Sequence, residues 1–187
     1  GRYRDVDGDG IPYRTIPGDG MPTYFCRGSG HNELAEYSES ATDYEDNLKR
    51  LNRKFETARK LVPGLVVERA SDGPIGVIAY GSSHWSTIES CDQLVKMAGV
   101  TVEYARLRAY PFHADLGEFI DRHERIYVIE QNRDAQLLSL MRMELSSSRL
   151  VKLRSVLHYS GLPIDAQTIT ESVLAQEGCD LDPTEES

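Results

Sequence analysis

Apolar and polar positions change their spacing several times along the chain, and each spacing predicts a different element. Between residues 43 and 62 apolar side chains recur at helical spacing, which predicts a helix that Pro63-Gly64 ends. Thr42-Asp43-Tyr44-Glu45 has the pattern of a capping box at its start. Shorter apolar runs then alternate with further helical stripes. We expect strands at 65–68, 76–81, 100–107, 125–130 and 152–158, and helices at 85–98, 116–120, 137–145 and 164–174.

The alternation of strands and helices predicts the fold class. Strands separated by helices of this length need crossover connections, which produce a largely parallel sheet with helices on both faces. Ser71-Asp72-Gly73-Pro74 predicts a hairpin turn between the first two strands, with the first strand antiparallel at an edge. The sequence therefore predicts a three-layer α/β/α domain around a five-stranded, mostly parallel mixed sheet.

The two ends of the chain differ from this middle part. Seven of the 15 Gly and three of the 8 Pro lie within residues 1–30, a density that favours turns over helix or strand. We expect residues 1–42 to form an irregular arm or linker and residues 43–175 to form the domain. Residues 176–187 contain five acids and no base, so we expect a disordered acidic tail.

Composition excludes several classes of protein. The net charge is −9, from 21 Lys and Arg against 30 Asp and Glu, which argues against a nucleic-acid partner. No apolar run is long enough for a membrane span, and no signal peptide precedes the first helix. Cys26, Cys91 and Cys179 lie far apart, which argues against a disulfide framework or a self-contained metal cluster. We expect a cytoplasmic chain and, because it opens without Met in a turn-rich segment, a piece of a longer polypeptide.

One acidic motif in the arm is a candidate metal site. Asp5, Asp7 and Asp9 have the Asp-x-Asp-x-Asp-Gly spacing that presents several hard oxygen ligands to Ca²⁺. Ile16 stands where the bidentate Glu of a complete loop belongs. The alternative is an acidic turn that makes hydrogen bonds within itself.

A second motif imitates a cofactor signature. Gly18-Asp19-Gly20, followed by Asn47, has the pattern with which thiamine-diphosphate enzymes hold Mg²⁺. That site requires the Gly triplet at the end of a buried strand, and Tyr13-Arg14-Thr15-Ile16-Pro17 is a poor strand. Coincidence in an arm rich in Gly and Asp is the favoured interpretation.

Polar side chains also follow two of the predicted strands. Ser82 and Ser83 come after one strand, and Glu130 and Asn132 lie at the end of another. Open α/β sheets place both ligands and interfaces at this edge, so these four residues are candidate anion or interface contacts. Helix capping by the Ser hydroxyls or by Asn132 is the alternative.

Several sequence blocks occur in the order found in one enzyme family. They include Arg106-Leu107-Arg108-Ala109-Tyr110-Pro111-Phe112 and Glu130-Gln131-Asn132-Arg133-Asp134-Ala135-Gln136, together with residues 3–15, 28–33, 53–59, 76–82 and 161–164. Through these blocks the chain resembles the C-terminal part of the α subunit of a 2-oxoacid:ferredoxin oxidoreductase, most closely the 2-oxoglutarate type. The resemblance runs from Tyr3 to about Leu174.

The resemblance implies an enzyme complex that decarboxylates a 2-oxoacid on thiamine diphosphate with Mg²⁺. Electrons would pass through iron–sulfur clusters to ferredoxin, and the acyl group to coenzyme A. In the family the thiamine site lies between an upstream domain of α and the β subunit, and the cluster cysteines belong to partners. No catalytic or cofactor-binding residue is therefore expected in this chain, and no cofactor is expected on the chain alone.

The resemblance also implies a place in an assembly. Residues 43–175 resemble a transketolase C-terminal-like domain that packs the complex, and residues 1–42 resemble the end of the pyrimidine-binding domain. The expected partners are the β subunit and, through the complex, ferredoxin and coenzyme A, in a dimerised αβ assembly. An exposed apolar patch on the helices or strand ends would favour this role.

Two alternatives stay open at this point. The first is a free-standing α/β module that binds an anion or a protein at Ser82, Asn132 and His158. The second is the equivalent domain of a lipoamide-linked 2-oxoacid dehydrogenase, which shares the architecture but lacks the arm blocks.

Overall fold

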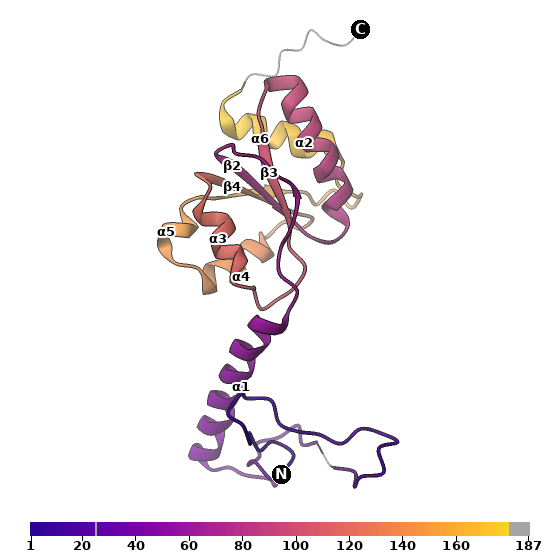
Figure 1. The fold of residues 1–187 in the computed structure, drawn as a ribbon, viewed down its shortest axis with the longest axis vertical. Helices are drawn as coiled ribbons and strands as arrows, with labels where there is room; N and C mark the ends of the chain where they lie inside the picture. The colour runs from indigo at the N-terminus through magenta and orange to yellow at the C-terminus, as the bar shows by residue number, and fades with distance from the viewer. Residues whose placement is uncertain (25, 180–187) are drawn as a thin grey trace. The chain divides into compact units, whose positions relative to one another are not determined.

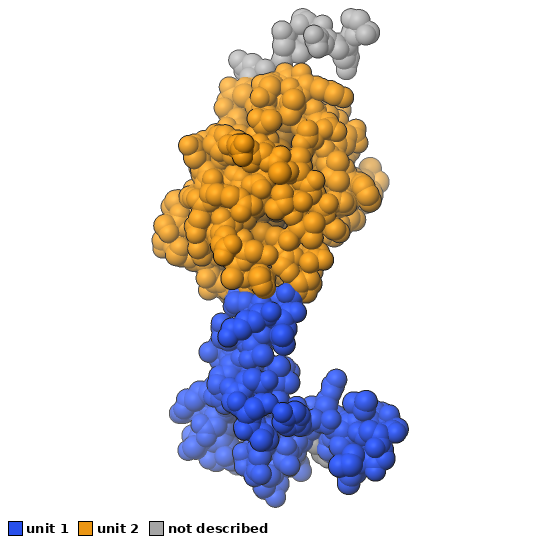
Figure 2. All heavy atoms as spheres, in the orientation of Figure 1, with its two compact units in different colours: residues 1–62 blue, residues 63–187 orange. Residues whose placement is uncertain are grey.

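The computed structural model describes residues 1–24 and 26–179 (Figure 1). The chain divides into two compact units, residues 1–62 and residues 63–187 (Figure 2). We call them unit 1 and unit 2. The boundary falls after Val62 and not at residue 42, because the long helix makes its contacts with the residues that precede it.

Unit 1 is an irregular arm held on one helix, α1 (Ala41–Leu61). The predicted helix is present, but Ser40 caps it by accepting a hydrogen bond from the Asp43 amide, so the capping box predicted at Thr42 is wrong. Thr57 and Arg50 donate to the carbonyls of Asp9 and Gly10 at 2.6 and 3.1 Å. Gly10 has a φ of 82°, and a Cβ there would lie 2.2 Å from the Lys54 amide, so this close approach requires glycine.

Unit 2 contains a five-stranded sheet in the order β1-β3-β2-β4-β5. All neighbouring strands are parallel except β1, which runs antiparallel to β3 at one edge. The strands are β1 (Val66–Arg69), β2 (Ile75–Ala79), β3 (Val102–Arg106), β4 (Arg125–Glu130) and β5 (Leu153–Leu157). The predicted five-stranded, mostly parallel mixed sheet is confirmed.

One predicted pairing is wrong. The turn at 71–74 does not join a hairpin, because β2 is the central strand and pairs with β3 on one side and β4 on the other. Every residue of β2 is buried, so its apolar run belongs between two parallel neighbours. β1 pairs with β3 instead. Its predicted position at an edge and its predicted antiparallel direction are both confirmed.

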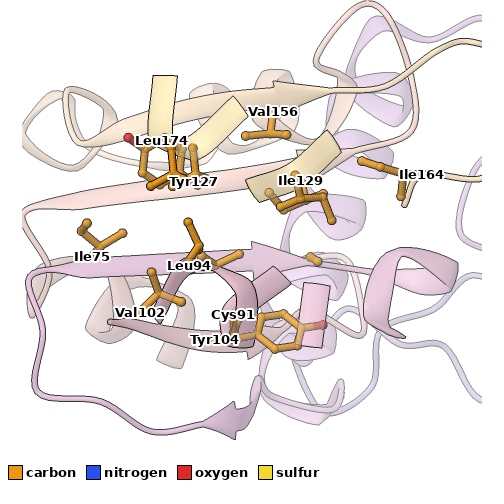
Figure 3. Packing of buried hydrophobic residues seen from close by; sticks show 14 residues of the cluster. Ile75, Cys91, Leu94, Val102, Tyr104, Tyr127, Ile129, Val156, Ile164 and Leu174 are labelled. Carbon is orange, nitrogen blue, oxygen red and sulfur yellow. The ribbon is translucent and has the colours of Figure 1, made fainter. Parts of the chain in front are cut away.

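Helices cover both faces of the sheet, which gives the predicted three layers (Figure 1). The helices of unit 2 are α2 (His84–Ala98), α3 (Asp115–Asp121), α4 (Gln136–Glu144), α5 (Ser147–Leu150) and α6 (Ala166–Glu177), and a 3-10 turn at Gly81–Ser83 precedes α2. One core cluster packs Cys91 and Leu94 of α2 and Leu174 of α6 against the strands (Figure 3). The other packs α3 and α4 against the opposite face.

The C-terminal end is ordered further than the composition predicts. Gln176 and Glu177 belong to α6, which ends at Gly178 in the left-handed conformation. Glu177 accepts hydrogen bonds from Arg125 at 2.7 and 2.9 Å and from Tyr127 at 2.6 Å, so it anchors the helix end to β4. The rest of the predicted acidic tail, residues 180–187, lies outside the described residues.

Candidate functional site

The structure brings the three candidate metal ligands together. One carboxylate oxygen from each of Asp5, Asp7 and Asp9 lies within 4.8 Å of the others. Asp5 Oδ1 accepts from the amides of Gly8 and Gly10, each at 3.0 Å, and its Oδ2 pairs with Arg53 at 2.9 Å. These bonds give the loop its shape without an ion, as the alternative interpretation requires. The metal site stays a prediction.

The electrostatics of the same loop favour the ionised form of Asp5. Partial burial acts to raise the pKa of this carboxyl, but the hydrogen bond from Arg53 and those from the Gly10 and Gly8 amides outweigh it and hold the pKa below its usual value. Asp5 is therefore a permanent anion at neutral pH, and it fastens the arm to α1 through Arg53.

The thiamine-like motif is not assembled. Asp19 accepts hydrogen bonds from the Ile16 and Met21 amides at 2.7 and 2.8 Å, within its own turn. Asn47 lies on α1, with its side-chain nitrogen 3.1 Å from a ring nitrogen of His31. No hydrogen bond joins these two side chains among the described residues, and the interpretation of the motif as coincidence stays a prediction.

Glu130 at the end of β4 is completely buried, and its environment explains its role. The carboxylate accepts from the amides of Leu137 and Leu138 at 2.7 and 3.1 Å, and from the Asn132 side chain at 2.8 Å. It therefore supplies the negative charge at the N-terminus of α4. The two amides that could bind an external anion already have this partner within the chain.

Ser82 and Ser83 are joined to the same region by a residue that the sequence reasoning missed. Gln131 donates to both hydroxyls at 3.0 Å, and its carbonyl oxygen accepts from the Ile164 amide at 3.1 Å. Ser83 occupies the N-cap position of α2 but neither Ser makes a side-chain cap hydrogen bond, so the alternative of capping by a Ser hydroxyl is wrong. The only sequence signal for Gln131 was its place after a buried strand, at the edge where loops meet.

The clearest exposed feature of unit 1 is an apolar row along α1. Its members recur at helical spacing, and the exposed fractions of their side chains range from 36% to 64%; they are Tyr44, Leu48, Leu51 and Phe55. We call them the helix stripe. The polar residues Asn47, Arg50 and Thr57 instead face the arm. The apolar row of this helix therefore stays partly exposed, unlike that of an ordinary surface helix, although Tyr44, Leu48 and Leu51 also line a hollow together with residues 28–31 of the arm.

Unit 2 exposes large apolar side chains at the carboxyl edge of its sheet. Trp85 at the start of α2 is 75% exposed, and Tyr159 and Leu162 in the loop after β5 are 66% and 73% exposed. Ser86 donates to the Ile164 carbonyl at 2.6 Å, which ties the start of α2 to that loop. Trp and Tyr are the residues most enriched at the centres of protein interfaces. Exposed large apolar side chains therefore occur at the strand ends as well as on α1.

Fold and surface together define an open α/β domain with exposed apolar faces. Among the described residues, no helix combines the length and apolarity needed to cross a bilayer. No family model matches the chain. No curated protein matches it either.

Solved structures do match. The chain is similar to 2-oxoglutarate:ferredoxin oxidoreductase from Magnetococcus marinus, solved with 2-oxoglutarate, coenzyme A and succinyl-CoA bound, with a TM-score of 0.75 and 22% identity. The match covers 94% of this chain and 31% of that one, so the chain spans about a third of its neighbour's length. A split-gene transketolase, described as an inactive β4 tetramer, matches 63% of this chain and 41% of its own at 12% identity and a TM-score of 0.47. The first match shows a shared fold and agrees with the resemblance that the sequence blocks carry.

Proposed function

We propose that the chain is the C-terminal assembly domain of the α subunit of a 2-oxoacid:ferredoxin oxidoreductase, with 2-oxoglutarate as the 2-oxoacid. The whole complex would decarboxylate the 2-oxoacid on thiamine diphosphate with Mg²⁺ and form an acyl-CoA. Iron–sulfur clusters would carry the electrons to ferredoxin. This chain would contribute packing surface, and other parts of the complex would hold the cofactors.

The helix stripe is the observation that carries this proposal. Four large apolar side chains that stay 36–64% exposed forgo part of the about 1.5–3 kcal/mol that full burial of each would provide. Packing within unit 1 covers these side chains only in part, because the arm is hydrogen-bonded to the neighbouring polar face of α1 through Arg50 and Thr57. An amphipathic helix that presents Tyr, Leu and Phe at this spacing fits an apolar groove on another protein. We propose that the β subunit of the same complex provides that groove.

A binding measurement tests the assembly role. The chain would be co-expressed with the β subunit of a 2-oxoglutarate:ferredoxin oxidoreductase, and the complex would be quantified by size-exclusion chromatography with light scattering. We expect a stable complex that Leu48→Glu and Phe55→Glu each weaken by about tenfold or more, since 1.4 kcal/mol corresponds to a factor of ten in affinity.

The matched control adds the same charge elsewhere on the helix. Thr42→Glu places a carboxylate on an exposed position of α1 outside the stripe, and we expect it to bind like wild type. If the stripe variants and the control all bind with wild-type affinity, α1 does not contact the β subunit and the assembly role loses its support.

A further inference from the structure

A cavity opens at the carboxyl edge of the sheet of unit 2, between the loops that follow β2 and β3. It has a volume of about 460 Å³, which is in the range of small-molecule sites. Its lining comes from residues 80 and 81 after β2, residues 107–110 and 112 after β3, and residues 136, 137 and 140 of α4. We call it the β2–β3 cavity.

The topology of the sheet places a crevice at this point. β2 and β3 are adjacent parallel strands, yet the helices that follow them lie on opposite faces of the sheet (Figure 1). α2, which follows β2, packs with α6 in one core cluster, and α3, which follows β3, packs with α4 in the other. Connections that leave adjacent strands toward opposite faces open a crevice at the carboxyl ends of those strands, where open α/β sheets bind their ligands.

The lining of the β2–β3 cavity is mostly apolar and aromatic. Leu107, Phe112 and Leu137 are buried members of the core, so their side chains are held in place by packing. Tyr80 and Tyr110 are exposed, and the Tyr110 ring meets the Phe112 ring edge-on with the ring centres 5.2 Å apart. Aromatic walls beside an apolar floor suit a flat aromatic ring, which packs against them by offset stacking or edge-to-face contact.

The cavity carries a single positive charge. Arg108 is the one charged residue among the described residues that line it. The Arg108 Nε donates to the Gly64 carbonyl at 3.0 Å, which fixes one edge of the guanidinium, and within the described structure its terminal nitrogens donate no hydrogen bond. Glu130, the acid whose charge reaches Tyr80, is buried and already accepts from two amides of α4. Its carboxylate therefore does not compete for Arg108.

We propose that the β2–β3 cavity binds an aromatic monocarboxylate, with its ring against Phe112 and the two tyrosines and its carboxylate on Arg108. Burial of the ring against the apolar lining supplies most of the affinity. Arg108 is exposed, so it contributes selectivity, because a guanidinium pairs with both oxygens of a carboxylate and a neutral group lacks that charge. One carboxylate balances the one cation of the lining. This inference goes beyond the proposed assembly role and does not rest on it.

Calorimetric titration of the full chain with 2-naphthoate tests the proposal. We expect saturable one-to-one binding with a Kd of about 1 mM or tighter, the affinity of a ligand of this size at ordinary efficiency. 2-Naphthalenemethanol has the same ring without the charge, and octanoate has the charge without the ring. We expect each to bind more weakly than 2-naphthoate by about threefold or more. Equal binding of the alcohol would overturn the role of Arg108, and equal binding of octanoate would overturn the aromatic assignment.

Two variants separate the effects of charge and shape. Arg108→Gln should weaken 2-naphthoate binding by about threefold or more and abolish the preference for the acid over the alcohol. Ala109→Phe adds a ring to the lining and should weaken binding of both naphthyl ligands by about tenfold or more, because the added ring occupies the space of the ligand. Circular dichroism would establish that both variants are folded.

Arg133→Gln is the matched control, because Arg133 is exposed in the loop after β4, pairs with Asp134 and lies outside the lining of the cavity. We expect it to bind 2-naphthoate like wild type. Absence of saturable binding would overturn the proposal, as would an equal loss in Arg108→Gln and the control.

A competition experiment separates this site from the proposed function. 2-Oxoglutarate has two carboxylates and no ring, so we expect it not to displace 2-naphthoate, and displacement would overturn the aromatic assignment. Leu48→Glu and Phe55→Glu leave the lining of the cavity unchanged, so we expect both to bind 2-naphthoate like wild type. Failure of this proposal is therefore distinguishable from failure of the assembly role.

Discussion

At the scale of single residues, Glu130 shows how a correct position can carry a different role from the expected one. Its place after a buried strand marked it as a contact for an external anion. In the structure it is the anion, buried against the first amides of α4. Residue type and position were visible in the sequence. The direction of the Glu130 side chain was not visible, because it depends on where α4 begins, six residues later.

Glu130→Gln tests this role. A neutral amide presents only one acceptor oxygen to two backbone donors and loses the charge that suits the helix N-terminus. Hydrogen bonds to a charged group are worth about 1.5–3 kcal/mol, so we expect the free energy of unfolding to fall by about 2–3 kcal/mol in urea denaturation. Glu118→Gln, at an exposed position on α3, serves as control and should change stability by less than about 0.5 kcal/mol. Equal stability of the two variants would contradict the capping role.

The sequence predicts side-chain contacts between residues that are close along the chain, but not those between residues far apart. The Asp5, Asp7 and Asp9 cluster was predictable because neighbours in sequence stay neighbours in a tight loop. The pairing of Arg50 with Gly10, forty positions away, was not predictable from local spacing. The same holds for Gln131, whose amide bridges the loops after β2 and β4 and the segment before α6.

At the scale of elements, periodicity predicted nearly every helix and strand, whereas the choice of partners followed from the fold. The apolar row at Leu48, Leu51, Phe55 and Ala58 indicated an amphipathic helix, and α1 is one. Helical spacing shows which side chains share a face of the helix. It does not show which of these faces the rest of the chain covers. In the same way β1 was correctly predicted as a strand but paired with β3, because the fully buried β2 needed two parallel neighbours. The one-turn α5 was missed, since four residues carry no periodicity.

The anchor between α6 and β4 predicts a pH dependence of stability. Burial acts to raise the pKa of Glu177, but the hydrogen bonds from Arg125 and Tyr127 and the charge of Arg125 hold it below its usual value. A carboxyl with a lowered folded pKa stabilises the fold above its unfolded pKa of 4.5, and this contribution is lost as the pH falls through the folded value.

We therefore expect Glu177→Gln to be less stable than wild type by about 1–2 kcal/mol at pH 7. The difference should shrink steadily below pH 4.5, which urea denaturation across this range would measure. Glu171→Gln changes an exposed carboxyl of the same helix and should show no such trend. A difference between wild type and Glu177→Gln that is constant with pH would show that the ion pair is not its source.

At the scale of the whole molecule, the two units differ in what holds them together. Every buried hydrophobic side chain of the described core belongs to unit 2, from Ile75 to Leu174. In the described part of unit 1 only Gly10 and Arg50 are buried. Unit 1 is therefore held mainly by hydrogen bonds between the arm and α1, most of them only part-buried, and by the ion pair of Asp5 with the exposed Arg53, and an ion pair of this kind contributes little stability.

This contrast predicts that unit 2 folds alone. Residues 63–187 expressed without unit 1 should unfold cooperatively, with a midpoint within about 3 °C of the full chain, since loss of 1 kcal/mol would shift a domain of this size by a few degrees. Residues 1–62 alone should show no cooperative transition in circular dichroism. The prediction would be contradicted if residues 63–187 alone were unfolded, or if residues 1–62 alone unfolded in a cooperative transition.

Because the helix stripe of α1 is exposed, the resistance of the chain to proteolysis depends on whether another protein covers the stripe. A segment without a core of its own gains stability from whatever covers the helix stripe, and that gain rises with the concentration of the covering protein. A copy made in excess of its partner presents Tyr44, Leu48 and Phe55 on a helix that opens easily, and an opened segment is what proteases cut. Under the proposed assembly role, the abundance of the chain would follow that of its partner, because surplus copies would be degraded.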